Sequence, residues 1–163
     1  MLIVLDDVLD EAHRQAVVGF FSQGDEARKA KWEKGGVDNL CGNQSPMALL
    51  LNRAAQFFDL SSMIGSEYWA HYGTRPDWHV DKDEKLYQMS GNTECPICSV
   101  VYYAEIDKDL VGGKFMTETA TVSPVTNRMI VFPPGLIHGV EPFTGKRLAV
   151  AINPWAHKPT TYL

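Results

Sequence analysis

The chain has 163 residues, of which 45% are hydrophobic and 21% charged, a size and composition typical of one compact domain with a buried core. This apolar fraction excludes a disordered chain, and 13 glycines and 9 prolines without a regular period exclude a fibrous protein. A formal net charge of -5 offers no general attraction for a phosphate backbone or an anionic membrane surface. We therefore expect neither nucleic acid nor a membrane as a partner.

The opening apolar run, residues 2–5, is followed at once by two aspartates and has no basic flank. It predicts a short first strand rather than a signal sequence or a membrane span. The three cysteines, Cys41, Cys95 and Cys98, are an odd and sparse set that argues against a disulfide framework. We therefore expect a cytoplasmic protein.

Two helices are predicted in the first sixty residues. Asp10 is a suitable N-cap for a helix whose apolar residues recur at three- and four-residue steps until Gly24. Ser45 followed by Pro46 predicts the start of a second helix, whose apolar side chains continue to Phe58. Between them, the charged stretch 25–44 is expected to be partly helical around residues 27–33.

From about residue 66 the sequence changes to short runs of aromatic and β-branched residues separated by Gly, Pro and Asn, a pattern typical of antiparallel strands. The predicted strands are residues 67–72, 78–80, 99–106, 114–117, 120–122, 128–132, 139–142 and 146–153. Eight short strands suit a sandwich or barrel of the jelly-roll type, with the helices covering one sheet face. Residues 82–85 and 92–94 are expected to lie in a loop.

His79 and Asp81 are the first part of a candidate metal site. Residues two apart on a strand point to the same face, so an imidazole and a carboxylate lie side by side. With His138 as a third ligand, two nitrogens and one oxygen would face a metal, as in non-haem Fe(II) oxygenases. Taken alone, the pair is a weak signal, because a hydrogen-bonded surface histidine gives the same pattern.

A second signal is Arg147, which shares one face of the last predicted strand with Ala149 and Ala151. A guanidinium inside a barrel is costly unless an anion meets it, and small neighbours leave room for one. A carboxylate held bidentately is the natural candidate. For the arginine alone we favour an internal salt bridge, for instance with Glu105 or Glu118. When the candidate metal ligands are also considered, a bound carboxylate is favoured instead.

The set His79-x-Asp81, His138 and Arg147, with Gly112-Gly113-Lys114-Phe115 between them, resembles the 2-oxoglutarate and Fe(II)-dependent dioxygenases. The resemblance is to the prolyl 4-hydroxylase-like branch and covers roughly residues 68–155. It implies a double-stranded β-helix core, with Fe(II) held by His79, Asp81 and His138 and the distal carboxylate of 2-oxoglutarate paired with Arg147. It also implies O2 as a cosubstrate, release of succinate and CO2, and hydroxylation of a substrate carbon.

The same family often adds a tyrosine hydroxyl to that carboxylate, and residues 100–104 resemble the segment that supplies it. Tyr103 is the first choice, because it shares a strand face with Val101 and Glu105. Tyr72 and Tyr68 are further candidates for lining the pocket, with ordinary core packing as the alternative.

These expectations combine into one dioxygenase domain over residues 1–163. Residues 1–65 would form a helical support, 66–155 a mainly β jelly-roll catalytic core, and 156–163 a tail. The expected substrate is a peptide or protein, with a prolyl residue as the leading target, or else a free amino acid or other small molecule. The oligomeric state and the target stay open.

Two alternatives come from other functional classes. One is a jelly-roll protein that binds a metal or small ligand without oxygenase activity. The other is a thiol or zinc module built on Cys95 and Cys98. The sequence shows neither the βαβ pattern that surrounds a redox-active cysteine pair nor a nearby second pair of zinc ligands, so a structural role is favoured.

Overall fold

The computed structural model describes all residues from Met1 to Leu163. Its largest element is a six-stranded antiparallel sheet of order β1-β8-β4-β11-β3-β2. These strands are β1 (Ile3–Leu5), β8 (Arg128–Phe132), β4 (Ser99–Ile106), β11 (Arg147–Trp155), β3 (Gly65–Tyr72) and β2 (Lys31–Lys34). Since β11 lies in the middle, its side chains are buried along its whole length.

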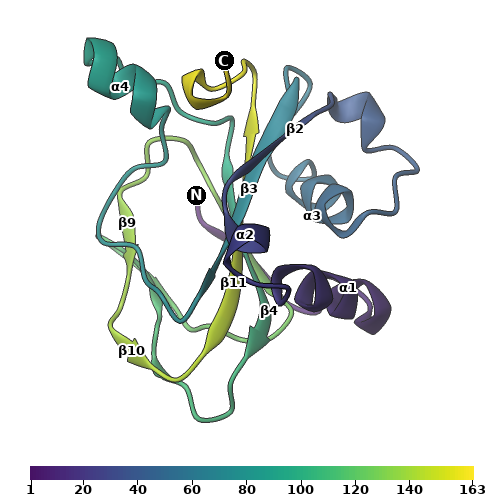
Figure 1. Ribbon diagram of the computed structural model, residues 1–163, viewed down its shortest axis with the longest axis vertical. Helices are drawn as coiled ribbons and strands as arrows, with labels where there is room; N and C mark the ends of the chain where they lie inside the picture. The colour runs from purple at the N-terminus through teal and green to yellow at the C-terminus, as the bar shows by residue number, and fades with distance from the viewer.

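Two smaller sheets lie on the other side of the molecule, around β9 and β10 in Figure 1. The three-stranded sheet contains β7 (Thr121–Val122), β6 (Phe115–Thr117) and β9 (His138–Val140), and the two-stranded sheet contains β10 (Phe143–Thr144) and β5 (Val111–Gly112). This arrangement is the predicted jelly-roll core, mainly β with N-terminal helices, and it places β9 where it can face the large sheet.

The helices α1 (Glu11–Phe21) and α3 (Pro46–Ala54) lie together on one side of the large sheet (Figure 1). Both predicted N-caps are confirmed, because the side chain of Asp10 accepts from His13 N at 2.8 Å and that of Ser45 accepts from Ala48 N at 3.3 Å. The remaining helical elements are α2 (Asp25–Arg28), α4 (Glu84–Ser90) and the short 3-10 turns η1 (Val37–Asn39) and η2 (Thr160–Tyr162). None of the helices has the length and apolar character that a membrane crossing requires.

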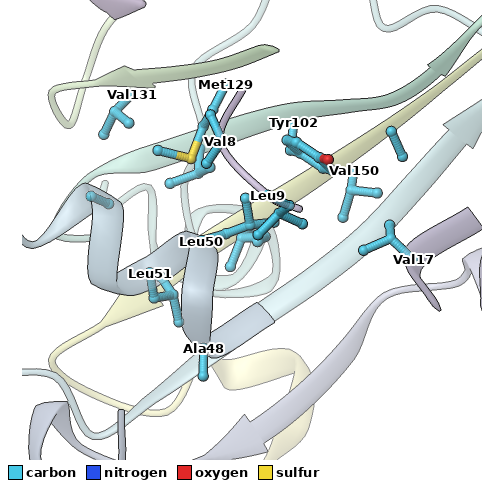
Figure 2. Close-up of a cluster of buried hydrophobic side chains, with 14 of the residues drawn as sticks. Val8, Leu9, Val17, Ala48, Leu50, Leu51, Tyr102, Met129, Val131 and Val150 are labelled. Atoms are coloured by element: carbon cyan, nitrogen blue, oxygen red, sulfur yellow. The ribbon is translucent and has the colours of Figure 1, made fainter. Parts of the chain in front are cut away.

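Apolar side chains form two separate cores, one on each face of the large sheet. The larger core joins α1 and α3 to the sheet and includes Val17, Leu50, Tyr102 and Val150 (Figure 2). The smaller core lies between the sheets and consists of Tyr103, Phe115, Val122, Ile130, Phe132 and Ala149. Alternation along β4 and β11 therefore decides which side chains enter the space between the sheets.

The helix expected around residues 27–33 ends at Arg28, and Lys31–Lys34 form the edge strand β2 instead. The pairing of β2 with β3 brings Trp32 over Gly65, so closely that a Cβ there would be 2.3 Å from its ring. The segment expected as a loop contains α4, which begins at the N-cap Asp83 and ends at Gly91 with φ 74°. No residue of α4 is buried, so this short helix has no core-facing stripe of apolar residues by which to recognise it.

Candidate active site

His79, Asp81 and His138 converge between the sheets, and their possible metal-ligating atoms all lie within 4.8 Å of one another. Asp81 Oδ1 is 3.3 Å from His79 Nε2 and 3.9 Å from His138 Nε2. The strand predicted for 78–80 is reduced to one bridge, in which His79 pairs with His138 at the start of β9. This bridge brings together ligands that are far apart in the sequence.

Each of the two imidazoles has a defined tautomer. Nδ1 of His79 donates to the carbonyl of Asp77 at 2.7 Å, and Nδ1 of His138 donates to that of Leu136 at 2.9 Å. A carbonyl can only accept, so Nδ1 of each ring carries a hydrogen, and Nε2 of each ring is the nitrogen that lies toward Asp81 and can bind a metal. Outer hydrogen bonds of this kind fix the ring orientation of metal-ligating histidines.

The electrostatics of the three groups suit a cation. Burial by itself would raise the pKa of Asp81, but the neighbouring His79, His138 and Ser99 outweigh burial and hold the pKa below its ordinary value. The hydrogen bond with Asp81 raises the pKa of His79, whereas burial lowers that of His138. A carboxylate with two imidazole nitrogens on one side is a donor set that fits Fe(II).

Arg147 begins β11 and is only 2% exposed. Its Nε has no hydrogen-bond partner in the chain, and no acidic side chain acts on the guanidinium, whose pKa is lowered by burial. Two aromatic rings flank it, with Cζ 4.9 Å from the ring centre of Phe143 and 5.6 Å from that of Tyr103. The arginine is therefore not part of an internal salt bridge.

The reason is a β-bulge in the pairing of β11 with β4. Leu148 pairs with Glu105, but the next residue, Ala149, pairs with Tyr103, so Ala104 is skipped. Glu105 consequently shares the helix-facing side with Leu148 and acts on Arg14 of α1, while Tyr103 faces the inside. Strict alternation along β4 would place Glu105 on the same face as Tyr103. The bulge breaks this alternation, so the carboxylate of Glu105 does not reach Arg147.

Tyr103 and Arg147 line the same cavity as the metal group. The cavity is lined by Trp69, His71, Pro76, His79, Asp81, Val101, Tyr103, Phe115, His138, Val140, Arg147, Ala149 and Ala151. The hydroxyl of Tyr103 is buried without a partner, and burial raises the pKa of this phenol, so it stays a hydrogen-bond donor at neutral pH. Two buried donors without partners beside a metal-binding group fit a bound carboxylate.

The motif Gly112-Gly113 supports this end of the cavity. Gly112 has φ 81°, and a Cβ there would be 2.2 Å from the carbonyl oxygen of Pro142. The close approach allows β5 to pair with β10, whose Phe143 packs against Arg147.

The structure does not place Tyr72 or Tyr68 in the cavity. Tyr72 lies on the other face of β3, with the cationic groups of Arg28 and Lys146 at 5.2 and 5.9 Å from its ring centre. Tyr68 packs edge-on against Phe21 of α1, with ring centres 6.5 Å apart.

The residues of β3 that line the cavity of Arg147 are Trp69 and His71, which pair with Ala151 and Ala149 of β11. Trp69 Nε1 donates to His71 Nε2 at 3.1 Å, and burial lowers the pKa of His71 to about 4, so it is neutral near pH 7. They face the cavity because the register of β3 with β11 places them opposite the small residues that follow Arg147, and no local sequence signal gives this register.

The cysteines do not take part in a metal-binding group. The one group of three or more His, Cys, Asp or Glu side chains with converging ligand atoms is that of His79, Asp81 and His138. Cys98 is fully buried in the helix-facing core, where burial raises its pKa to about 12, and Cys41 is exposed. The zinc module considered from the sequence thus has no ligand set, and a reactive thiol at Cys98 is disfavoured.

Comparisons with solved structures identify similar folds at low sequence identity. The viral collagen prolyl hydroxylase of Paramecium bursaria Chlorella virus-1, in complex with 2OG, superposes with a TM-score of 0.60 at 11% identity, covering 96% of each chain. A prolyl-4-hydroxylase of Pseudomonas putida gives 0.60 at 14% identity, covering 96% of this chain and 93% of that one. A Trichoplax adhaerens prolyl hydroxylase, in complex with a peptide fragment of hypoxia inducible factor, gives 0.53 at 14% identity, with 99% and 86% covered.

No curated protein sequence matches the chain significantly. The family model of the 2OG-Fe(II) oxygenase superfamily, in contrast, matches residues 66–157, more than half of the sequence. That segment contains every member of the metal group together with Tyr103 and Arg147. The chain therefore belongs to the 2OG-Fe(II) oxygenase superfamily, as a dioxygenase that uses Fe(II), 2-oxoglutarate and O2.

Proposed function

We propose that the protein hydroxylates a carbon of a peptidyl residue, with proline as the leading target, while 2-oxoglutarate is converted to succinate and CO2. The observation that supports this function most strongly is the buried guanidinium of Arg147. It has no carboxylate partner within the chain, and it lines the same cavity as the metal group and the unpartnered Tyr103 hydroxyl.

In this proposal His79 Nε2, a carboxylate oxygen of Asp81 and His138 Nε2 hold the iron. When bound, the iron with its cosubstrates supplies the oxidative chemistry. Arg147 and Tyr103 bind and orient the distal carboxylate of 2-oxoglutarate through charge-assisted hydrogen bonds. The apolar walls, among them Phe115 and Val140, exclude water and strengthen these interactions.

A peptide substrate is favoured by the surface beside the metal group. Trp78, Tyr87 and Ile137 are 52%, 46% and 45% exposed, and they line a cleft that also contains His79. Large exposed apolar side chains next to a reactive centre are suited to hold residues that flank a target. The similarity to prolyl hydroxylases, one of them in complex with a peptide, supports the same choice.

The test begins with purified protein and Fe(II) under anaerobic conditions. Addition of 2-oxoglutarate should produce a visible metal-to-ligand absorption band, and admission of oxygen should release succinate. Proline-containing peptides should then stimulate succinate release and gain the mass of one oxygen atom. Absence of both the band and succinate would favour a binding protein without oxygenase activity. If only free amino acids stimulated succinate release, the substrate would be a small molecule rather than a peptide.

A further inference from the structure

Four alternate residues of β11 point to the inside of the molecule, and the last of them, Asn153, lies at the opposite end from Arg147. Ala149 and Ala151 lie between them, and both line the cavity that contains Arg147. Asn153 instead lines a second cavity, which is also lined by His79 and Asp81. Two of the three metal ligands, His79 and Asp81, therefore line both cavities, whereas His138 lines only the cavity that contains Arg147.

Asn153 is only 2% exposed, and its Oδ1 is buried without a hydrogen-bond partner. A carboxamide oxygen in this state is costly unless a donor reaches it. Asn153 lines the cavity, so a ligand bound there could supply the donor once the carboxamide turns its oxygen toward the cavity. The chain itself supplies none.

Glu67 of β3 is the cross-strand partner of Asn153 and lines the same cavity. Its Oε1 accepts a hydrogen bond from the hydroxyl of Tyr162 at 2.7 Å. The ring of Tyr162 stacks on Trp32 with 6.0 Å between ring centres, so the C-terminal turn η2 holds the carboxylate in place. Cross-strand pairs lie close enough for one small group to contact both side chains.

The cations around this cavity already have anionic partners. Arg28 pairs with Asp25 at 2.7 Å, and Lys29 pairs with Glu26 at 2.5 Å. Lys82 pairs with Glu84 at 2.8 Å. The inner wall thus presents acceptors, and the complementary ligand group is a donor.

We propose that Asn153 and Glu67 receive an N–H group of the primary substrate and determine which substrates the enzyme accepts. This inference rests on the proposed function, because it assigns the second cavity to the molecule that is hydroxylated. The N–H group belongs either to the ammonium of a free amino acid or to a backbone amide of a peptide. Both present the same donor chemistry to this wall.

Binding can be measured without turnover on protein loaded with Mn(II) and 2-oxoglutarate in the absence of oxygen. Calorimetric titrations would use two sets of probes, the free L-amino acids and the N-acetyl L-amino acid methylamides. The tightest binder of either set would then be compared with its fully N-methylated counterpart, which lacks the N–H donor. We expect N-methylation to weaken binding to the native protein at least tenfold.

Asn153→Leu should weaken binding of the tightest probe about tenfold. In this variant, N-methylation of the probe should cause almost no further loss of affinity. Asn153→Asp keeps an acceptor oxygen and should retain the sensitivity to N-methylation. Asn43→Leu, at an exposed position outside both cavities, is the matched control. Far-ultraviolet circular dichroism and thermal unfolding would establish that each variant is folded.

The proposal is overturned if Asn153→Leu binds the probe as tightly as the native protein does, or if N-methylation lowers the affinity of both proteins by the same factor. It is also overturned if no member of either set binds the loaded native protein. Failure of the native protein to bind Mn(II) or 2-oxoglutarate would instead contradict the proposed function. The set that contains the tightest binder distinguishes a free amino acid from a peptide.

Discussion

His79 and His138 exchange both of their backbone hydrogen bonds, with His79 N donating to His138 O at 2.9 Å and His138 N donating to His79 O at 3.0 Å. Their rings consequently lie with centres 4.3 Å apart. Because the main chain makes this bridge, the two ligands are held together whether or not their side chains bind a metal. The metal group is therefore organised by the fold itself.

The bridge separates metal binding from folding in a testable way. His138→Ala removes one ligand but keeps both main-chain hydrogen bonds, so the variant should stay folded. Since loss of an outer-shell partner alone costs about 10–100-fold in metal affinity, loss of a direct ligand should cost at least on the order of 100-fold. Titration with Mn(II) measures this loss, and His13→Ala on α1 is the control. Equal metal affinity in the two variants would contradict the ligand assignment.

Replacement of Arg147 should have opposite effects on cosubstrate binding and on stability. Arg147→Met should weaken 2-oxoglutarate binding by about 2–5 kcal/mol, roughly thirtyfold to several thousandfold, with metal affinity retained. Without ligands the same variant should be as stable as the native protein, or up to about 4 kcal/mol more stable, because it removes a buried unpaired charge. Calorimetry and denaturant unfolding provide the two measurements. Normal 2-oxoglutarate affinity would refute the role of Arg147.

The neighbouring tyrosines of β4 form a matched pair. The hydroxyl of Tyr103 faces the cavity without a partner, whereas that of Tyr102 donates to Asn127 Oδ1 at 2.7 Å on the helix side. Tyr103→Phe should weaken the binding of 2-oxoglutarate by about 1.5–3 kcal/mol, roughly 10- to 150-fold, and leave the free energy of unfolding nearly unchanged. Tyr102→Phe should lower the free energy of unfolding by about 1 kcal/mol and leave cosubstrate affinity intact. The reverse pattern would contradict the assignment of Tyr103 to the site.

Cys98 should make stability depend on pH in the alkaline range. Burial raises its pKa to about 12, while an unfolded thiol ionises near about 8.5. Its contribution is therefore fully present below about pH 8.5 and is lost as pH rises toward 12, with a slope of up to about 1.4 kcal/mol per pH unit. Unfolding by urea at several pH values should show a steeper decline for the native protein than for Cys98→Ala. Parallel declines would contradict the prediction, and the exposed Cys41→Ala should behave like the native protein.

The sequence predicted the parts of the fold that depend on short-range chemistry. The caps at Asp10 and Ser45 start helices through hydrogen bonds to residues three positions ahead. The alternation of Arg147, Ala149 and Ala151 holds because β11 is regular on that face. The spacing of His79 and Asp81 places both side chains at the same site, as expected.

The features that the sequence did not predict depend on contacts between distant segments. The strand β2 pairs with β3 so that Trp32 packs over Gly65, a pairing that no local pattern reveals. The assignment of Tyr72 to the pocket failed because parity on β3 is determined by its register with β11, where His71 pairs with Ala149. The skipped residue Ala104 likewise becomes visible only when β4 and β11 are aligned.

The skipped residue also has a consequence for what keeps the pocket open to the keto acid. If β4 and β11 paired without the bulge, Ala104 would lie opposite Leu148 and Glu105 opposite Arg147, so that the carboxylate of Glu105 would meet the guanidinium. The pocket would then neutralise itself, and 2-oxoglutarate would compete with a carboxylate of the protein. One extra residue in a single strand therefore keeps the arginine available to its ligand.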